Sequence, residues 1–214
     1  MIDEATLIDR LVADHRPAVP NAVQRKLLVA VGIGVVATLL AVLATGLRGD
    51  MGVAVTTPIF WFKLGYGGSF AMTAVIALAT LFRPGTETPQ RLALIFIPLA
   101  VAITLGAVEL FGEDGPTQSA LWLGQSALAC PLLIFGLSMP PAIALIIAAR
   151  RLAPTQLRLT GAVIGLASGG IAALLYALHC PESGYSFVAT WYSLGIFAAV
   201  AVGYLIGPAV LRWK

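Results

Sequence analysis

LLVAVGIGVVATLLAVLATGL, residues 27–47, is an apolar stretch without a single charged residue. A helix rises about 1.5 Å per residue, so roughly 20 residues of this kind span the core of a lipid bilayer. Five more stretches of this character follow, at about 65–82, 92–111, 127–148, 159–178 and 187–210. Lipid offers the backbone no hydrogen-bond partner, and none of the stretches alternates like a barrel strand, so each is expected to be a helix. The sequence predicts an all-α polytopic membrane protein, a bundle of six transmembrane helices.

The composition of the chain supports a membrane location. Of 214 residues, 59% are hydrophobic and only 11% are charged, and the mean hydropathy is +0.93. An ordinary soluble domain carries about 25% charged residues. The net charge of +3 requires no nucleic-acid partner, because anionic lipid headgroups attract basic loops. We therefore expect the lipid bilayer, and no nucleic acid, as a partner.

Basic residues predict the orientation, because Lys and Arg are retained on the cytoplasmic side of a membrane. If the N-terminus is inside, 11 of the 13 basic residues fall in cytoplasmic segments: Arg10, Arg16, Arg25, Lys26, Arg83, Arg91, Arg150, Arg151, Arg158, Arg212 and Lys214. Only Arg48 and Lys63 then fall in outer segments. Both termini are predicted to be cytoplasmic.

The sequence predicts two parts: an N-terminal segment, residues 1–26, and a six-helix membrane domain, residues 27–214. The segment is too long and too acidic for the start of a typical signal peptide. A short amphipathic helix is predicted within residues 3–15, because apolar side chains recur there at helical spacing: Leu7, Ile8, Leu11 and Val12. Such a helix is marginal alone in water, and its acidic polar face favours a protein groove over a lipid surface. A solvated tail is the remaining alternative.

The two cysteines of the chain, Cys130 and Cys180, both fall toward the outer ends of predicted helices. Cys130 precedes Pro131, a residue favoured at the first position of a helix, so Cys130 is expected to cap that helix. At a helix N-terminus the thiolate is stabilised and its reactivity rises. If the helix begins near Trp122 instead, Cys130 lies deeper and is less reactive.

Cys180 is expected in a short outer loop that is wet and accessible to oxidants. The adjacent His179 could raise its thiolate fraction or join Cys130 and Cys180 in binding a soft metal such as copper or zinc. A transient heavy-metal ion at these residues is the one candidate cofactor. A permanent structural disulfide is an equally weighted alternative to oxidant or metal sensing.

Several short motifs give the chain a resemblance to a known family. They are RRLAPT at 150–155, GA at 161–162, YALHC at 176–180, FV at 187–188, WY at 191–192 and LGI at 194–196. The start LID at 7–9, RP at 16–17, RPG at 83–85 and Cys130 extend the likeness over nearly the whole chain. With these motifs the chain resembles the negative-regulator-of-sigma-F (NrsF-type) family of proteobacterial membrane anti-sigma factors.

The resemblance implies a function in transcription regulation at the bacterial inner membrane. The cytoplasmic N-terminus is expected to hold an extracytoplasmic-function sigma factor, with Leu7, Ile8, Leu11 and Val12 as the docking side chains. Cys130 and Cys180 match the cysteine pair of the family and are expected to sense oxidant or heavy-metal stress from the periplasm. A disulfide or a captured metal would then shift the fourth and fifth helices and release the sigma factor.

Two other classes of protein are weighed against this one. The chain has no GxxxxGK[ST], HExxH, GxSxG or CxxC motif, so an enzyme is not expected. A membrane thiol oxidoreductase would need a close redox pair or a quinone site. A small-solute transporter would need a polar pathway, and the centres of the predicted helices hold no charge.

Overall fold

The computed structural model describes residues 21–82, 93–112, 115–152 and 154–212, and the regular structure of these residues is entirely helical. Within this part, six helices are long and apolar enough to cross a membrane, which confirms the predicted number of spans. They are Ala22–Thr45 (α2), Pro58–Leu81 (α4), Ala93–Gly112 (η1 and α6), Ala129–Arg150 (α8 and α9), Leu157–Tyr176 (α10) and Tyr185–Val210 (α11, η2 and α12). The predicted N-terminal helix with Leu7, Ile8, Leu11 and Val12 lies outside the described residues.

Several spans are composite, and two short helices lie between spans. The third span joins η1 (Ala93–Ile95) to α6 (Phe96–Gly112), and the fourth joins α8 (Ala129–Leu137) to α9 (Met139–Arg150). The sixth joins α11 (Tyr185–Phe187), η2 (Val188–Tyr192) and α12 (Ser193–Val210). The connecting helices are α3 (Met51–Ala54) and α7 (Gly115–Leu123).

The second span begins seven residues before the predicted start at 65. Thr57 is extended and Pro58 occupies the first turn of α4, where its missing N–H costs no hydrogen bond. Lys63 therefore lies inside the span, and its predicted place in an outer segment was wrong. The consequence is a cation within the helix bundle.

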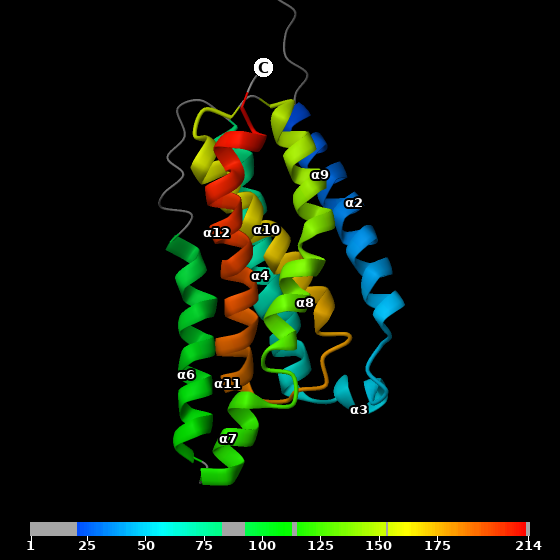
Figure 1. The fold of residues 1–214 in the computed structure, drawn as a ribbon, viewed down its shortest axis with the longest axis vertical. Helices are drawn as coiled ribbons and strands as arrows, with labels where there is room; N and C mark the ends of the chain where they lie inside the picture. Colours follow the sequence, from blue (N-terminus) through cyan, green and yellow to red (C-terminus); the bar gives the residue numbers. More distant parts are fainter. Residues whose placement is uncertain (1–20, 83–92, 113–114, 153, 213–214) are drawn as a thin grey trace, which may run out of the picture.

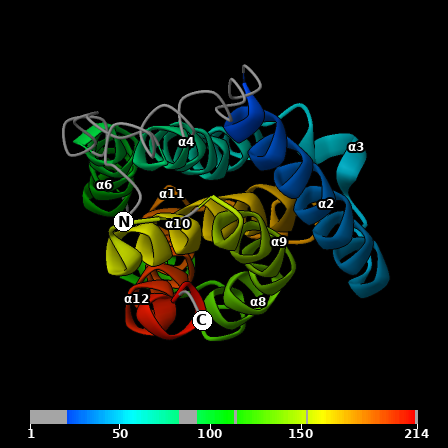
Figure 2. The same ribbon diagram turned by 90° about the horizontal axis from the view of Figure 1, so that it is seen from above.

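Successive spans run in opposite directions, and the other spans surround α10 (Figures 1 and 2). α10 packs against α4 on one side and α12 on the other, whereas α2 packs mainly against α9. α10 is the most buried of the six spans and α6, at the periphery, is the least. The described basic residues other than Arg48 and Lys63 gather at one end, where α2 and α10 begin and α9 and α12 end (Figure 1): Arg25, Lys26, Arg150, Arg151, Arg158 and Arg212.

Glycines bring α10 into backbone contact with both neighbours. A Cβ at Gly161 or Gly165 would collide with backbone carbonyl oxygens of α12, and a Cβ at Gly170 would lie 2.5 Å from the backbone nitrogen of Ala71 in α4. Small residues at a helix interface permit this approach in a membrane, where dispersion contacts replace the hydrophobic effect. Gly161, Gly165 and Gly169 thus form a small-residue ridge along α10 that faces α12.

The fourth span is interrupted between α8 and α9, next to the Pro140–Pro141 pair at the start of α9. Pro141 has no N–H to offer the carbonyl oxygen of Leu137, four residues earlier. The hydroxyl of Thr38 in α2 donates to that oxygen instead, at 3.2 Å. The freed backbone acceptor thus ties α2 to the break in the fourth span.

Candidate functional site

Cys130 and Cys180, the candidate sensing residues from the sequence, lie together at the end of the bundle opposite the basic residues. Cys130 lies in the first turn of α8, and Cys180 lies in the connection between α10 and α11, residues 177–184. Both are free thiols, and the thiol of Cys130 is within hydrogen-bonding reach of the Cys180 sulfur. The two thiols are therefore neighbours, as a disulfide between them requires.

Both thiols are fully buried, with 0% exposure. The expectation of a wet, oxidant-accessible loop around Cys180 was therefore wrong. The connection 177–184 folds inward because several groups of the bundle bind its backbone and the carboxylate of Glu182. These side chains and their partners define the site.

Lys63 is the main tie between the connection and the bundle. Its ammonium donates to the carbonyl oxygens of Cys180, at 3.2 Å, and of Glu182, and it lies 3.6 Å from the Cys180 sulfur. The side chain is fully buried, and the ammonium lies 5.8 Å from the centre of the Tyr192 ring. Sequence reasoning missed Lys63, although a lysine within the apolar run IFWFKLGYGG, residues 59–68, is itself a signal of function.

The surroundings of Cys180 favour its thiolate. The hydrogen bond from the Cys130 thiol and the charge of Lys63 together outweigh burial, and they lower the pKa of Cys180 below that of an ordinary cysteine. A larger fraction of the group is then thiolate than in a free cysteine. Cys180 has the character of a nucleophile, and Cys130 that of the thiol that can complete a disulfide.

Arg48 holds the same connection from the other side. Its guanidinium donates to the carbonyl oxygens of Cys180, at 3.1 Å, and Pro181, at 3.3 Å. Asp50 orients the guanidinium through two bonds of 2.7 Å, and the Arg48 partner lowers the pKa of this carboxyl. Two cations, Arg48 and Lys63, thus converge on the carbonyl oxygens of residues 180–182.

Glu182 fastens the connection to the turn between α7 and α8. Its carboxylate accepts from the backbone N–H of Gln125 and from the hydroxyl of Ser126, both at 2.9 Å. Gly124 has a φ of 54° and leaves no room for a side chain, because a Cβ there would lie 2.6 Å from the carboxyl carbon of Glu182. The turn that precedes Cys130 and the connection that carries Cys180 are therefore one unit.

His179 does not join the cysteines. Its Nδ1 is 2.7 Å from the carbonyl oxygen of Gly46 at the end of α2, so the ring is turned toward α2. Among the described residues, no three His, Cys, Asp or Glu side chains are placed to hold a metal ion. The structure brings together Cys130 and Cys180 but not the third member of the predicted metal set.

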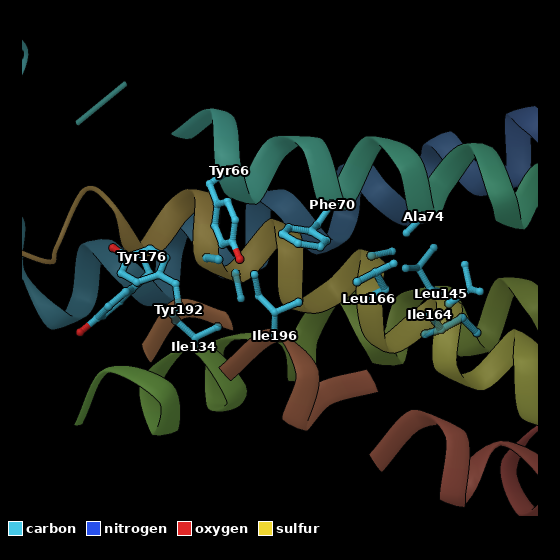
Figure 3. Close-up of a cluster of buried hydrophobic side chains, with 14 of the residues drawn as sticks. Tyr66, Phe70, Ala74, Ile134, Leu145, Ile164, Leu166, Tyr176, Tyr192 and Ile196 are labelled. Carbon is cyan, nitrogen blue, oxygen red and sulfur yellow. The ribbon is translucent and has the colours of Figure 1, made fainter. Parts of the chain in front are cut away.

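Two tyrosines form the aromatic wall of the site. Tyr176 at the end of α10 and Tyr192 in the π-helical turn η2 have ring centres 5.8 Å apart, and they lie side by side at one end of the buried row in Figure 3. Tyr192 is fully buried beside Cys180, and its hydroxyl makes no hydrogen bond of ordinary geometry with the described residues. π-helical turns are rare in proteins and are frequently found at functional sites.

Glu109 of α6 caps the start of the sixth span next to this site. Its carboxylate accepts from the backbone N–H of Tyr185, at 3.0 Å, and from the N–H and hydroxyl of Ser186, both at 2.8 Å. A carboxylate at the N-terminus of a helix satisfies free donors and opposes the helix dipole. Glu109 therefore anchors the peripheral α6 to the helix that carries Tyr192.

Replacement of Glu109 by Gln is expected to loosen the start of α11. The neutral amide accepts more weakly and adds a donor that faces other donors, so we expect a loss of about 1–2 kcal/mol of stability. Hydrogen exchange of the Tyr185 and Ser186 amides measures the effect and should accelerate. Gln118→Ala is the control, since it removes a hydrogen bond to Leu110 at the same end of α6. Equal exchange in the Gln variant and the wild type would contradict the capping role.

Comparisons with known proteins give a consistent result. The family described as "Negative regulator of sigma F", NrsF, matches residues 11–213. A "Probable anti-sigma-F factor NrsF" of Azospira oryzae is 39% identical over 195 residues, which cover 91% of this chain and 91% of that protein. An "Anti-sigma-F factor NrsF" of Caulobacter vibrioides is 38% identical over 213 residues, which cover 97% of this chain and 98% of that protein. No solved structure gives a significant match.

Proposed function

Because the chain belongs to the NrsF family, the negative regulators of sigma F, we propose that it is a membrane-bound anti-sigma factor. The observation that carries the proposal is the match to two proteins named as anti-sigma-F factors over more than nine-tenths of the chain. We assign the partner to the extracytoplasmic-function class of sigma factors. This role is regulatory rather than enzymatic.

The proposal includes a location and an orientation. Six apolar helices are compatible with the bacterial inner membrane. The concentration of Arg and Lys at one end of the bundle supports a cytoplasmic side there, with both termini inside. The thiol site then faces the periplasm, and the N-terminal segment faces the cytoplasm, where a sigma factor is available.

In this proposal the N-terminal segment sequesters the sigma factor. Its apolar side chains Leu7, Ile8, Leu11 and Val12 dock in a groove of the partner and cover a surface that RNA polymerase requires. The acidic residues of the polar face suit a protein partner better than an anionic membrane.

The thiol pair is proposed as the sensor. The contact between Cys130 and Cys180 supports a switch between a dithiol and a disulfide, and the lowered pKa of Cys180 supports attack on an oxidant. The separation of His179 from the pair favours oxidation over metal capture as the primary signal. To move the sigma factor from 99% bound to 99% free, the signal must favour release by about 5.5 kcal/mol.

The signal has a short path toward the cytoplasmic end. Cys130 lies in α8, and the break at Ser138 separates α8 from α9, which ends at Arg150 beside the basic connection to α10. Cys180 follows α10, which begins at the other end of that connection. We propose that a disulfide shifts α8 and the end of α10, and that the connection around 150–158 moves with them.

Capture of the sigma factor by the full-length protein tests the proposal. The purified chain, in detergent and immobilised by its C-terminus, is incubated with host lysate, and bound proteins are identified by mass spectrometry. We expect a sigma factor on the wild type and a loss of about 100-fold or more on Leu7→Asp/Leu11→Asp, because two charges would enter an apolar groove.

The matched control carries Thr6→Asp and Ala13→Asp. These positions lie on the opposite face of the predicted helix, so the same charge is added without entering the groove. Retained capture by this control and lost capture by the Leu variant identify the docking face. If the wild type retains no sigma factor, the proposed function is wrong, and dithiol turnover and proteoliposome uptake would then test the oxidoreductase and transporter alternatives.

A further inference from the structure

Lys63 is a buried cation without a carboxylate partner. Its side chain has 0% exposure, and the one ion pair among the described residues is Arg48 with Asp50. Glu182 contacts Lys63 through its backbone carbonyl oxygen, while its carboxylate binds Gln125 and Ser126. An ammonium group buried in an apolar bundle is strongly unfavourable unless an anion neutralises it. The atom in contact with Lys63 that can carry a negative charge is the sulfur of Cys180, 3.6 Å away.

We propose that Lys63 is the positioning residue of the thiol site, as the counter-charge of the Cys180 thiolate, and that disulfide formation destabilises the site by removing this anion. The inference rests on the proposed function, because it concerns the regulation of the same two thiols. It assigns Lys63 two effects: activation of Cys180 before oxidation, and displacement of the connection 177–184 afterwards.

The groups around Cys180 single out Lys63 for this role. Charged or titratable side chains surround the thiol: Lys63 of α4, Arg48 before α3, Cys130 of α8, Tyr176 of α10 and Tyr192 of η2. Glu182 of the connection itself approaches it only through its backbone, because its carboxylate binds Gln125 and Ser126. Arg48 reaches the carbonyl oxygen of Cys180, whereas Lys63 reaches both that oxygen and the sulfur. The neutral tyrosines and the Cys130 thiol supply no positive charge.

Oxidation by a hydroperoxide illustrates the change of charge. The Cys180 thiolate attacks one oxygen of hydrogen peroxide, the O–O bond breaks, and the departing hydroxide takes a proton from solvent to become water. The Cys130 sulfur then attacks the resulting sulfenic acid, the S–O bond breaks, and the hydroxyl leaves with the thiol proton as a second water. The two sulfur atoms are oxidised to a neutral disulfide and the peroxide is reduced to two waters. One negative charge has disappeared from the site.

After this step Lys63 retains only neutral partners. Loss of one member of a buried charge pair leaves the other uncompensated, which is strongly destabilising. The strain is relieved when Lys63 loses its proton or when its ammonium moves toward water. Both changes weaken the hydrogen bonds to Cys180 and Glu182 that hold the connection against α4. The chemical event at sulfur thereby acts on the backbone between α10 and α11.

Alkylation of Cys180 as a function of pH tests the first effect. The full-length reduced protein in lipid nanodiscs is treated with N-ethylmaleimide, and the Cys180 peptide is quantified by mass spectrometry. We expect a midpoint below that of an ordinary cysteine for the wild type, in line with the lowered pKa of Cys180. In Lys63→Met the midpoint should rise by about 1–3 pH units, and in Lys63→Arg, which keeps the charge, it should stay near the wild-type value. An unchanged midpoint in Lys63→Met would overturn the inference.

Arg48→Gln is the matched control, because it removes a neighbouring cation that does not contact the sulfur. Its midpoint should move less than that of Lys63→Met. An equal shift of the midpoint in the two variants would show that Lys63 acts only through the summed positive charge near the thiol. That result would contradict its specific role. The measurement needs no sigma factor, so it can fail while thiol sensing holds, and it can succeed where the anti-sigma proposal fails.

A double-mutant cycle provides a second test. Cys180→Ser preserves the shape of the site but lacks the anion, so the wild-type Lys63 should destabilise this variant. Addition of Lys63→Met should then raise the melting temperature of Cys180→Ser but not that of the parent chain. Identical effects of Lys63→Met in the two backgrounds would show that the lysine and the thiolate are not coupled, and would overturn the inference even if the pH profiles cannot be measured.

Discussion

Cys130→Ser and Cys180→Ser are each expected to abolish the oxidant-triggered release of the sigma factor, and Cys130→Ser, which keeps the Cys180–Lys63 pair, is expected to leave its sequestration intact. Serine fits the volume of a buried thiol but forms no disulfide, so the switch loses its second state. The N-terminal segment is unchanged in both variants. Basal repression should remain in Cys130→Ser, whereas in Cys180→Ser the uncompensated Lys63 is expected to loosen the connection 177–184 before any oxidant is added. A transcriptional reporter dependent on the sigma factor, measured before and after a pulse of peroxide, gives both quantities in one strain.

A buried serine elsewhere in the bundle provides the control for this experiment. Ser168 of α10 is fully buried, and its hydroxyl donates within its own helix to the carbonyl oxygen of Gly165. Ser168→Ala should keep the wild-type response. An undiminished response in both cysteine variants would remove the thiols from the mechanism. Loss of the peroxide response with a retained response to copper or zinc would assign the remaining signal to another site.

Gly165→Leu is expected to cause a large loss of stability. A side chain at this position would collide with the carbonyl oxygen of Ala199 and lie 2.8 Å from the Cα of Val200, both in α12. Backbone atoms cannot rotate away, so α10 and α12 must separate. Overpacking in a core costs about 1–3 kcal/mol where side chains yield, and the cost is higher here. Thermal unfolding in detergent should show a large decrease in the melting temperature or no monodisperse protein.

Gly136→Leu is the matched control for the glycine ridge. Gly136 is exposed on α8, and a Cβ there would meet no atom within 4 Å. The same change of residue type should be neutral or mildly stabilising, because leucine is a better helix former than glycine. Similar melting temperatures of the two leucine variants would contradict the close approach of α10 and α12.

The helices were predictable because their signal is local. Each span is a run of apolar residues, and the length of such a run follows from the thickness of the bilayer. The start of α4 was missed because Lys63 interrupts its apolar run. When Lys and Arg are assigned to the segments between the spans, this lysine is placed in a loop. The break at Ser138 was predictable from Pro140 and Pro141, since a missing donor is a property of the residue itself.

Of the residues that form the site, only the two cysteines could be predicted from the sequence. Cys130 and Cys180 could be selected by their rarity, but their burial depends on contacts between residues far apart in the chain. Lys63 reaches Cys180 across 117 positions, and no pattern within a window reveals such a pairing. For the same reason the capping role of Glu109, which bonds residues 76 and 77 positions later, could not be derived from its place near the end of a helix.

For the proposed thiol sensor, the complete burial of the two sulfur atoms has a consequence for the time course of the response. An oxidant can reach Cys180 only when the connection opens, so the reaction rate is the product of the intrinsic chemistry and the fraction of time the site spends open. Short bursts of oxidant would decay before many molecules open, whereas sustained exposure would accumulate disulfides. A sensor of this kind behaves as a slow integrator, which averages its environment and ignores brief fluctuations.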